Sequence, residues 1–290
     1  MLVPEPMLKW LDVEPLYVLG IVLLTCMFVG ATVGFHIRLR LEREPKADVE
    51  KKWHHDYDGY IVSAVLGLLA LLLGFTFSLA IGRYEERRLL VVEEANAIGT
   101  AYLRVQLLGE PHRQRLSGLL IEFTKSEIQM GRLGQGPKTR LLADDRDELT
   151  SNLWAATAAA FDSVRTAPLA LALVQAMNAV IDDSASHRAA RLVHVPTEVF
   201  AVLFVYSIGS AIVLGYVLAA GHGRVAAVFL LVLLCLSFLV VVDIDRPASG
   251  GIREPQQPME EALKSMESQP PQTFDRWRVD VLPHQAPVRD

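Results

Sequence analysis

Residues 60–82 form the stretch that decides the fold, and they are YIVSAVLGLLALLLGFTFSLAIG. The stretch contains no Asp, Glu, Lys or Arg. Its length matches the about 20 apolar residues that a helix rising 1.5 Å per residue needs to cross a bilayer. A charge at the centre would cost about 2.5–3.5 kcal/mol on insertion scales, so a span without one is informative. We therefore predict that residues 60–82 form a transmembrane helix.

Three further stretches have the same length and the same uncharged interior, namely residues 16–37, 197–219 and 224–242. The chain is 51% hydrophobic, and these blocks hold much of that fraction. No alternating pattern typical of strands is found elsewhere. The sequence therefore predicts an all-α, polytopic membrane protein with four transmembrane helices in a two-plus-two arrangement and a helical extramembrane domain between helices two and three.

The domain boundaries follow from the positions of these blocks. Between spans two and three, apolar residues recur at helical spacing, as at Leu89, Val92 and Val105. After the last span, Pro, Gln and charged residues dominate, and such a composition buries too little surface to offset its ordering entropy. Residues 1–15 are predicted to form an N-terminal interfacial segment, and residues 16–82 to form transmembrane helices 1 and 2, joined by a charged loop at 38–59. A helical extramembrane domain is predicted at 83–195. A transmembrane hairpin of helices 3 and 4 follows at 196–242, and a largely disordered tail at 243–290.

Composition and motifs exclude several classes of function. The net charge of −5 gives no strong field for a nucleic-acid partner. Both cysteines lie inside apolar blocks, so neither a disulfide framework nor a metal site is predicted from them. No nucleophile elbow, phosphate-binding glycine loop or zinc signature is present in the sequence. We therefore predict no enzyme activity, no catalytic residue, no metal site and no cofactor.

Small residues form stripes on three of the predicted spans. Helices in lipid associate by close backbone approach, so such stripes favour helix packing. The alternatives are that part of the span-two stripe lines a pore, or that the spacing is chance. The packing candidates are Gly30 and Gly34 in span one, Ser63, Gly67 and Gly82 in span two, and Ser207, Ala211 and Gly215 in span three.

A charged junction follows span two. On an unbroken helix Arg83 and Arg87 share a face, and Glu86 lies close enough for partial ion pairing within the helix. Two interpretations remain open: a solvated or headgroup-facing helix start, or an oligomeric ring of charges that concentrates ions at a pore mouth. The junction residues are Arg83, Glu86, Arg87, Glu93, Glu94 and Asn96.

Residues 74–104, and above all EANAIGTAYLR at 94–104, resemble the signature of the bestrophin-like family of largely bacterial membrane proteins. Asp245-Arg-Pro, followed by Gly250-Gly-Ile, is similar to the end of that family's domain. With the two-plus-two layout, the resemblance covers about residues 15–265. True bestrophins, which share this layout, are pentameric anion channels gated by calcium. The acidic calcium-binding cluster of eukaryotic bestrophins has no counterpart in this sequence.

The resemblance implies an oligomeric ion channel, with anions as one candidate for the permeant ion. Gly74, Phe75, Phe77 and Ser78 are then the pore or gate candidates, since a phenylalanine can form a hydrophobic constriction. Phe75 and Phe77 point about 200° apart on a helix, so at most one faces a central axis. The alternative is that both pack against neighbouring helices or lipid.

A second functional hypothesis is a non-conducting membrane scaffold or sensor whose helical domain binds another protein. Under either hypothesis the expected partners are the lipid bilayer and other copies of the chain, with ions added for a channel. The expected location is the cell membrane, specifically a bacterial inner membrane. Basic residues in 38–52 favour a cytoplasmic loop, whereas the arginines beyond spans two to four and the bestrophin layout favour the opposite face, so orientation stays open.

Two other groups of charged residues have open roles. Asp182, Asp183, His187 and Arg188 precede span three; they could sense protons or gather ions, or form a solvated helix end. Asp243 and Asp245, at the exit of span four, could attract cations or pair with Arg246.

Overall fold

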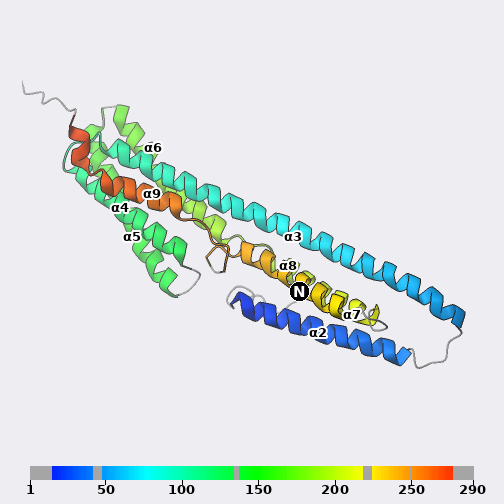
Figure 1. The fold of residues 1–290 in the computed structure, drawn as a ribbon. Coiled ribbons are helices and arrows are strands. Elements are labelled where there is room, and N and C mark those ends of the chain that lie inside the picture. Colours follow the sequence, from blue (N-terminus) through cyan, green and yellow to red (C-terminus); the bar gives the residue numbers. More distant parts are fainter. Residues whose placement is uncertain are drawn as a thin grey trace, which may run out of the picture. The chain divides into compact units, whose positions relative to one another are not determined.

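A computed structural model of the chain describes residues 15–41, 48–133, 137–166, 168–217, 224–248 and 250–276, and for 48–58, 137, 138, 140 and 224 it describes the backbone alone. Within these ranges the chain forms helices and no strand (Figure 1). The all-α prediction is confirmed. The elements are α2 (Leu16–Leu41), α3 (Asp48–Val105), α4 (His112–Arg132), α5 (Pro137–Val164), α6 (Pro168–Leu192), α7 (Thr197–Val217), α8 (Arg224–Asp245), α9 (Gln257–Ser268) and the 3₁₀ helix η2 (Pro271–Asp275).

Four helical stretches in the described part of the chain are long and apolar enough to cross a membrane. They are Leu16–Leu41, Gly59–Val105, Pro168–Val217 and Val225–Asp245. Each contains all or nearly all of one of the four spans predicted from the sequence, 16–37, 60–82, 197–219 and 224–242. The protein is therefore a multi-pass membrane protein, as predicted.

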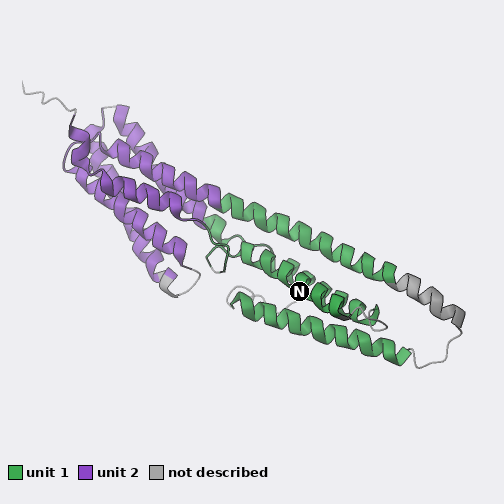
Figure 2. Cartoon of the chain, viewed as in Figure 1, with its two compact units in different colours: residues 1–87, 189–254 green, residues 88–188, 255–290 purple. Residues whose placement is uncertain are grey.

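The chain divides into two compact units, shown in green and purple in Figure 2. Unit 1 comprises residues 1–87 and 189–254, and unit 2 comprises residues 88–188 and 255–290. Unit 1 contains α2, α7, α8 and the first part of α3. Unit 2 contains the last part of α3, most of α6, and all of α4, α5, α9 and η2.

In unit 1, α2 and α7 cross with their backbones in contact at small residues. A Cβ added to Gly34 would overlap the carbonyl group of Ile212, and one added to Gly215 would overlap that of Ala31. A Cβ at Gly30 would lie 3.2 Å from the carbonyl oxygen of Ile208. Ser207 and Ala211, also on α7, are buried. Close approach at glycine gives the dispersion contact that drives helix association in lipid.

The small residues of span two behave differently. A Cβ added to Gly67 or Gly82 would meet no described atom within 4 Å, and Ser63 is exposed. Among the described residues, the packing predicted for these three positions is therefore not found. The reason is that α3 packs in unit 1 through Leu69 and Leu73, which lie on another face of the helix.

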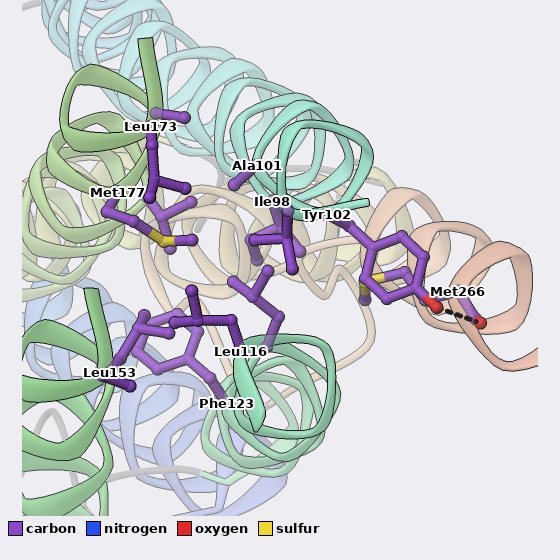
Figure 3. Packing of buried hydrophobic residues seen from close by; sticks show 14 of the residues in the cluster. Ile98, Ala101, Tyr102, Leu116, Phe123, Leu153, Leu173, Met177 and Met266 are labelled. Atoms are coloured by element: carbon purple, nitrogen blue, oxygen red, sulfur yellow. Dashed lines mark hydrogen bonds between the residues drawn. The ribbon is translucent and has the colours of Figure 1, made fainter. Parts of the chain in front are cut away.

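Unit 2 has a hydrophobic core to which five helices contribute (Figure 3). The core residues labelled there are Ile98, Ala101 and Tyr102 of α3, Leu116 and Phe123 of α4, Leu153 of α5, Leu173 and Met177 of α6, and Met266 of α9. All of these side chains are nearly inaccessible to solvent. This burial explains why α4 and α5, which carry many charges, still pack stably.

The prediction of a largely disordered tail is wrong for residues 250–276. Helix α9 places Met259 and Met266 seven positions apart, so both side chains fall on one face and enter the core of unit 2. The Tyr102 hydroxyl lies 2.8 Å from the carbonyl oxygen of Gln269, to which it donates. Arg113 binds both carboxylate oxygens of Asp275, at 2.5 and 3.0 Å. Residues 277–290 lie outside the described part.

The predicted bounds of the loop 38–59 are also wrong, because helices occupy both ends of this range. Residues 48–59 belong to α3, and Arg38 lies in the last turn of α2. Arg38 is buried and donates to the carbonyl oxygens of Tyr216 and Val217, each at 3.1 Å. These carbonyl groups lie in the last described turn of α7, where the negative end of the helix dipole favours a cation. Residues 42–47 and the predicted hairpin turn 221–223 lie outside the described residues.

We expect Gly215→Ala to destabilise the protein, because the added methyl group must enter space filled by the Ala31 backbone. Overpacking of this kind costs about 1–3 kcal/mol. Thermal unfolding of the detergent-solubilised protein measures the effect. Gly209→Ala is the matched control on the same helix, since nothing described lies within 4 Å of its Cβ position. Equal melting temperatures for the two variants would contradict the close crossing.

Candidate functional site

Helix α3 has one buried face that recurs every three or four residues. In unit 1 the buried positions are Leu69, Leu73, Thr76, Ala80 and Arg87, and in unit 2 they include Val91, Glu94 and Ile98. Because a helix turns about 100° per residue, this spacing keeps the buried side chains within one sector of the helix. The periodicity alone therefore decides which α3 residues pack inside the chain and which remain outside.

The opposite face of α3 carries small and polar residues. Gly67, Gly74, Ser78 and Gly82 are all exposed, and no described atom lies within 4 Å of a Cβ built on the glycines. At about 100° per residue, Ser78 points roughly 180° away from the mean direction of Leu69 and Leu73. In the described part of the chain, no helix covers this face.

Phe75 and Phe77 lie on either side of the small-residue face. Their exposed fractions in the single chain are 63% and 41%, so neither packs into the core of unit 1. Phe77 and Gly74 border an apolar groove of about 400 Å³ between α3 and α8, whose other lining residues are Leu73, Leu233, Leu236, Ser237, Val240 and Val241. Thr76, between the two phenylalanines, is buried and donates to the carbonyl oxygen of Leu72 at 2.8 Å.

The charged junction is partly buried, and Arg87 lies at its centre. The Arg87 side chain is 1% exposed, and its Nη2 donates to the carbonyl oxygen of Ile244 at 3.0 Å. The solvated helix start that we considered from the sequence is therefore wrong for Arg87. The contact follows from the end of α8, whose last carbonyl groups lack helical partners and attract a cation.

Other charges surround Arg87 within unit 1. The carboxylates of Asp245 and Glu254 and the guanidinium groups of Arg83 and Arg191 all lie within electrostatic range of it. Arg191 Nε lies 3.4 Å from a carboxylate oxygen of Glu254. The cluster therefore joins α3 electrostatically to the segments that end α8 and precede α7.

Asp243 and Asp245 bind backbone groups. Asp245 accepts a hydrogen bond from the Val195 N–H at 2.9 Å, and Asp243 accepts from the N–H groups of Gly251 and Ile252 at 2.9 and 3.0 Å. Gly250 has φ +121°, a conformation that side chains rarely adopt, and a Cβ there would collide with Asp243. The hydrogen bonds that these two buried carboxylates accept from backbone N–H groups account for the Asp-x-Asp and Gly-Gly pattern, so the pattern does not require a bound cation.

Glu94 and His187 form a buried pair in unit 2. Glu94 is fully buried, and one of its carboxylate oxygens lies 2.8 Å from Nδ1 of His187. The interpretation of His187 as part of a solvated helix end is therefore wrong. Residues 94 and 187 are far apart in sequence, and only the packing of α6 against α3 brings them together.

Glu127 of α4 lies beside this pair. It accepts a hydrogen bond from the Ser184 hydroxyl at 3.1 Å, and Nη1 of Arg146 lies 3.5 Å from the same oxygen. Burial, and then the nearby negative charge of Glu94, raise the pKa of Glu127 to about 7. Sequence analysis missed Glu127 and Arg146. The one available signal was their position in line with apolar residues of α4 and α5, which is weak for charged side chains.

The remaining junction residues stay outside the core. Glu86, Glu93 and Asn96 are exposed. No group of three or more His, Cys, Asp or Glu side chains in the described ranges has the geometry to hold a metal ion. The structure therefore separates the junction into buried charges that join helices and exposed charges on the free side of α3.

The sequence model of the Bestrophin-like domain matches residues 17–259, which is most of the chain. The chain belongs to the Bestrophin-like family. The resemblance identified at residues 74–104 is thus confirmed. Both sequence segments that carried the resemblance have a structural role in this Bestrophin-like chain. Residues of 94–104 contribute to the hydrophobic core of unit 2, and Asp243 binds the backbone of the Gly-Gly-Ile segment that follows α8. Among curated proteins, none matches the chain.

Solved structures of bacterial bestrophin homologues have a similar fold. The homologue from Klebsiella pneumoniae is 16% identical, with a TM-score of 0.57, and the match covers 84% of this chain and 95% of that one. A single-substitution variant of it matches with a TM-score of 0.58 at 16% identity, and the match covers 85% of this chain and 99% of that one. A second variant matches with a TM-score of 0.59 at 15% identity, and the match covers 84% of this chain and 98% of that one. At such low identity the likeness shows the fold alone.

We expect Arg87→Ala to lower the melting temperature strongly, because it leaves the buried Ile244 carbonyl group without its donor and removes a buried cation near Asp245 and Glu254. Removing one partner of a buried ionic contact costs about 3–5 kcal/mol. Arg88→Ala is the matched control, since Arg88 is the exposed neighbour on the same helix. Equal melting temperatures of Arg87→Ala and Arg88→Ala in the same detergent would refute this role of Arg87.

Proposed function

We propose that this Bestrophin-like chain assembles into a homo-oligomeric ion channel in which α3 faces the conduction path. One observation carries the proposal: the face of α3 with Gly67, Gly74 and Ser78, which also bears the exposed Leu71, is mostly small, partly polar and uncovered by any described helix of the chain. A wholly lipid-facing helix needs no such face. A closed ring of identical chains would place this face around a common axis.

The chemistry of this face suits conduction. Glycines leave room for a hydrated ion, and the Ser78 hydroxyl can replace a water molecule in its shell. One phenylalanine of the pair Phe75 and Phe77 can narrow the path into a hydrophobic constriction, while the other packs against a neighbouring helix or lipid. Because Phe77 borders the groove beside α8, Phe75 is the better candidate for the constriction.

The exposed charges of the junction favour cations as the permeant ions. Arg87 is buried and Arg83 is half-buried, whereas Glu86 and Glu93 are exposed and outnumber Arg88, the one exposed arginine in residues 83–96. A ring of carboxylates at a pore mouth attracts cations, and buried arginines do not contribute an equivalent ring for anions. The anion selectivity suggested by the distant bestrophin likeness therefore receives less support from this chain than cation selectivity.

The proposal also places unit 2 outside the hydrocarbon as the helical extramembrane domain. Its surface carries many exposed ionic groups, such as the pairs Lys125–Glu267, Arg132–Glu260 and Arg165–Asp162. Charges on helices in contact with lipid tails would be costly. The membrane itself is proposed to be a bacterial inner membrane.

A second candidate function is a non-conducting scaffold or sensor, and a groove in unit 2 favours it. The groove lies between α3 and α9, has a volume of about 630 Å³, and is lined by both apolar and polar residues, including Leu103, Ala262 and Gln269. A partner helix could occupy such a groove. Protein binding without ion flux would support this function over a channel.

Purified protein in liposomes should conduct ions, with cation flux exceeding anion flux. In a background with Cys26 and Cys235 replaced by Ala, Ser78→Cys should react with a charged, membrane-impermeant thiol reagent, and the reaction should reduce flux. The physical reason is that thiolate forms only where water reaches the sulfur.

Val205→Cys is the matched control for this experiment, because Val205 is 68% exposed on α7 and is expected to face lipid. It should neither react nor change flux. Absence of flux over a range of cations, anions, voltages and pH values would overturn the channel proposal. Equal reactivity of the two cysteines would overturn only the assignment of this α3 face to the conduction path, and the channel proposal would stand.

A further inference from the structure

Four helices of unit 2 bring ionisable side chains into one buried cluster. Glu94 comes from α3, Glu127 from α4, Arg146 from α5 and His187 from α6. The exposed fractions of these side chains are 0%, 5%, 3% and 6%. Unpaired charges are costly at such burial, so the cluster must be close to electrically neutral to be stable.

The contacts within the cluster leave one negative charge uncompensated. Glu94 contacts His187 at 2.8 Å, and Glu127 contacts Arg146 at 3.5 Å. Arg146 also binds the exposed carboxylate of Asp147 at 2.5 Å, which weakens its compensation of Glu127. With His187 neutral, two buried carboxylates therefore share a single guanidinium group. One proton added to Glu127 restores neutrality.

An unsatisfied oxygen marks the same place. Oε1 of Glu94 is buried and has no hydrogen-bond partner, although Oε2 is bonded to His187. A buried carboxylate oxygen without a donor costs free energy that a hydrogen bond from a protonated neighbour would recover.

Further charged groups face the cluster from the elements packed around it. On α6, Ser184 donates to Glu127, Arg188 Nε donates to the Ser184 carbonyl oxygen, and Asp183 lies within electrostatic range of Glu93 and Glu94. On α9, Glu260 and Glu267 are paired with Arg132 and Lys125 of α4. These neighbours add no further cation contact to Glu94 or Glu127.

We infer that Glu127, buried beside Glu94, His187 and Arg146, is a proton-binding switch that holds one exchangeable proton. When the proton leaves, an uncompensated negative charge remains in the core of unit 2, where α3, α4 and α6 meet. Repulsion between the two carboxylates then favours water entry and looser packing of these helices. The inference concerns the folding of unit 2 and does not depend on ion conduction.

The direction of the pH dependence follows from Glu127. Its pKa is raised from 4.5 to about 7, mainly by burial, so the folded state binds more protons than the unfolded state between these values. The free energy of unfolding therefore falls as the pH rises through this window and is highest on its acidic side. A carboxylate stabilised by an ion pair would give the opposite slope.

The test is thermal unfolding of the full-length protein in detergent, from about pH 5 to about pH 8. The wild-type melting temperature should fall across this range. Glu127→Gln keeps the volume and an acceptor for Ser184 but cannot titrate, so its curve should be flatter. Glu122→Gln is the matched control, because Glu122 is exposed on the same helix, and it should keep the wild-type slope.

Infrared spectroscopy gives a second readout that does not require any variant to be stable at high pH. A buried protonated carboxyl group has a C=O stretch distinct from that of a carboxylate. This band should be present in the wild type at low pH, disappear toward about pH 8, and be absent from Glu127→Gln. In Glu94→Gln the band should disappear at lower pH, because the neighbouring negative charge is gone.

Two results would overturn the switch. The first is an unchanged melting-temperature slope in Glu127→Gln. The second, which decides the matter if Glu127→Gln does not fold, is the absence of a pH-dependent carboxyl band from the wild type or an unshifted band in Glu94→Gln. Because neither readout measures ion flux, failure of the switch is distinguishable from failure of the channel proposal.

Discussion

The helical period of α3 is the constraint on which the rest of the structure depends. This helix runs without interruption from Asp48 to Val105 and contributes to both compact units. In each unit its buried residues recur every three or four positions, so one face is committed to the core. The opposite face is left to lipid, water or another chain. The fold of each unit and the proposed conduction path both follow from this division.

Buried charge is used sparingly and for different purposes in the two units. In unit 1, Arg38, Arg87 and Asp245 bind backbone groups at helix ends, where carbonyl and amide groups lack helical partners. These contacts join helices without requiring a side-chain ion pair. In unit 2, Glu94 and Glu127 are brought close together in the core, and neutrality there depends on a proton.

The last part of the described chain shows how a polar composition can mislead. Residues 250–276 contain few aliphatic side chains, yet α9 places Met259 and Met266 on one face, and η2 is held by Asp275 on Arg113. The core of unit 2 supplies the apolar surface that these residues lack by themselves. The composition of a segment shows how much apolar surface the segment itself can bury. It does not show how much apolar surface the rest of the chain presents for that segment to pack against.

The sequence by itself determined the membrane class, the four spans, the all-helical fold and the family, because uncharged runs of about 20 residues and the 94–104 signature are local properties of the chain. It also placed Gly34 and Gly215 on packing faces. Only the tertiary structure decided that Gly67 and Gly82 stay uncovered, that Arg87 is buried, and that Glu94 meets Glu127 and His187. The physical reason is that periodicity shows which residues share a helix face, whereas the partner of that face depends on contacts between residues far apart in sequence.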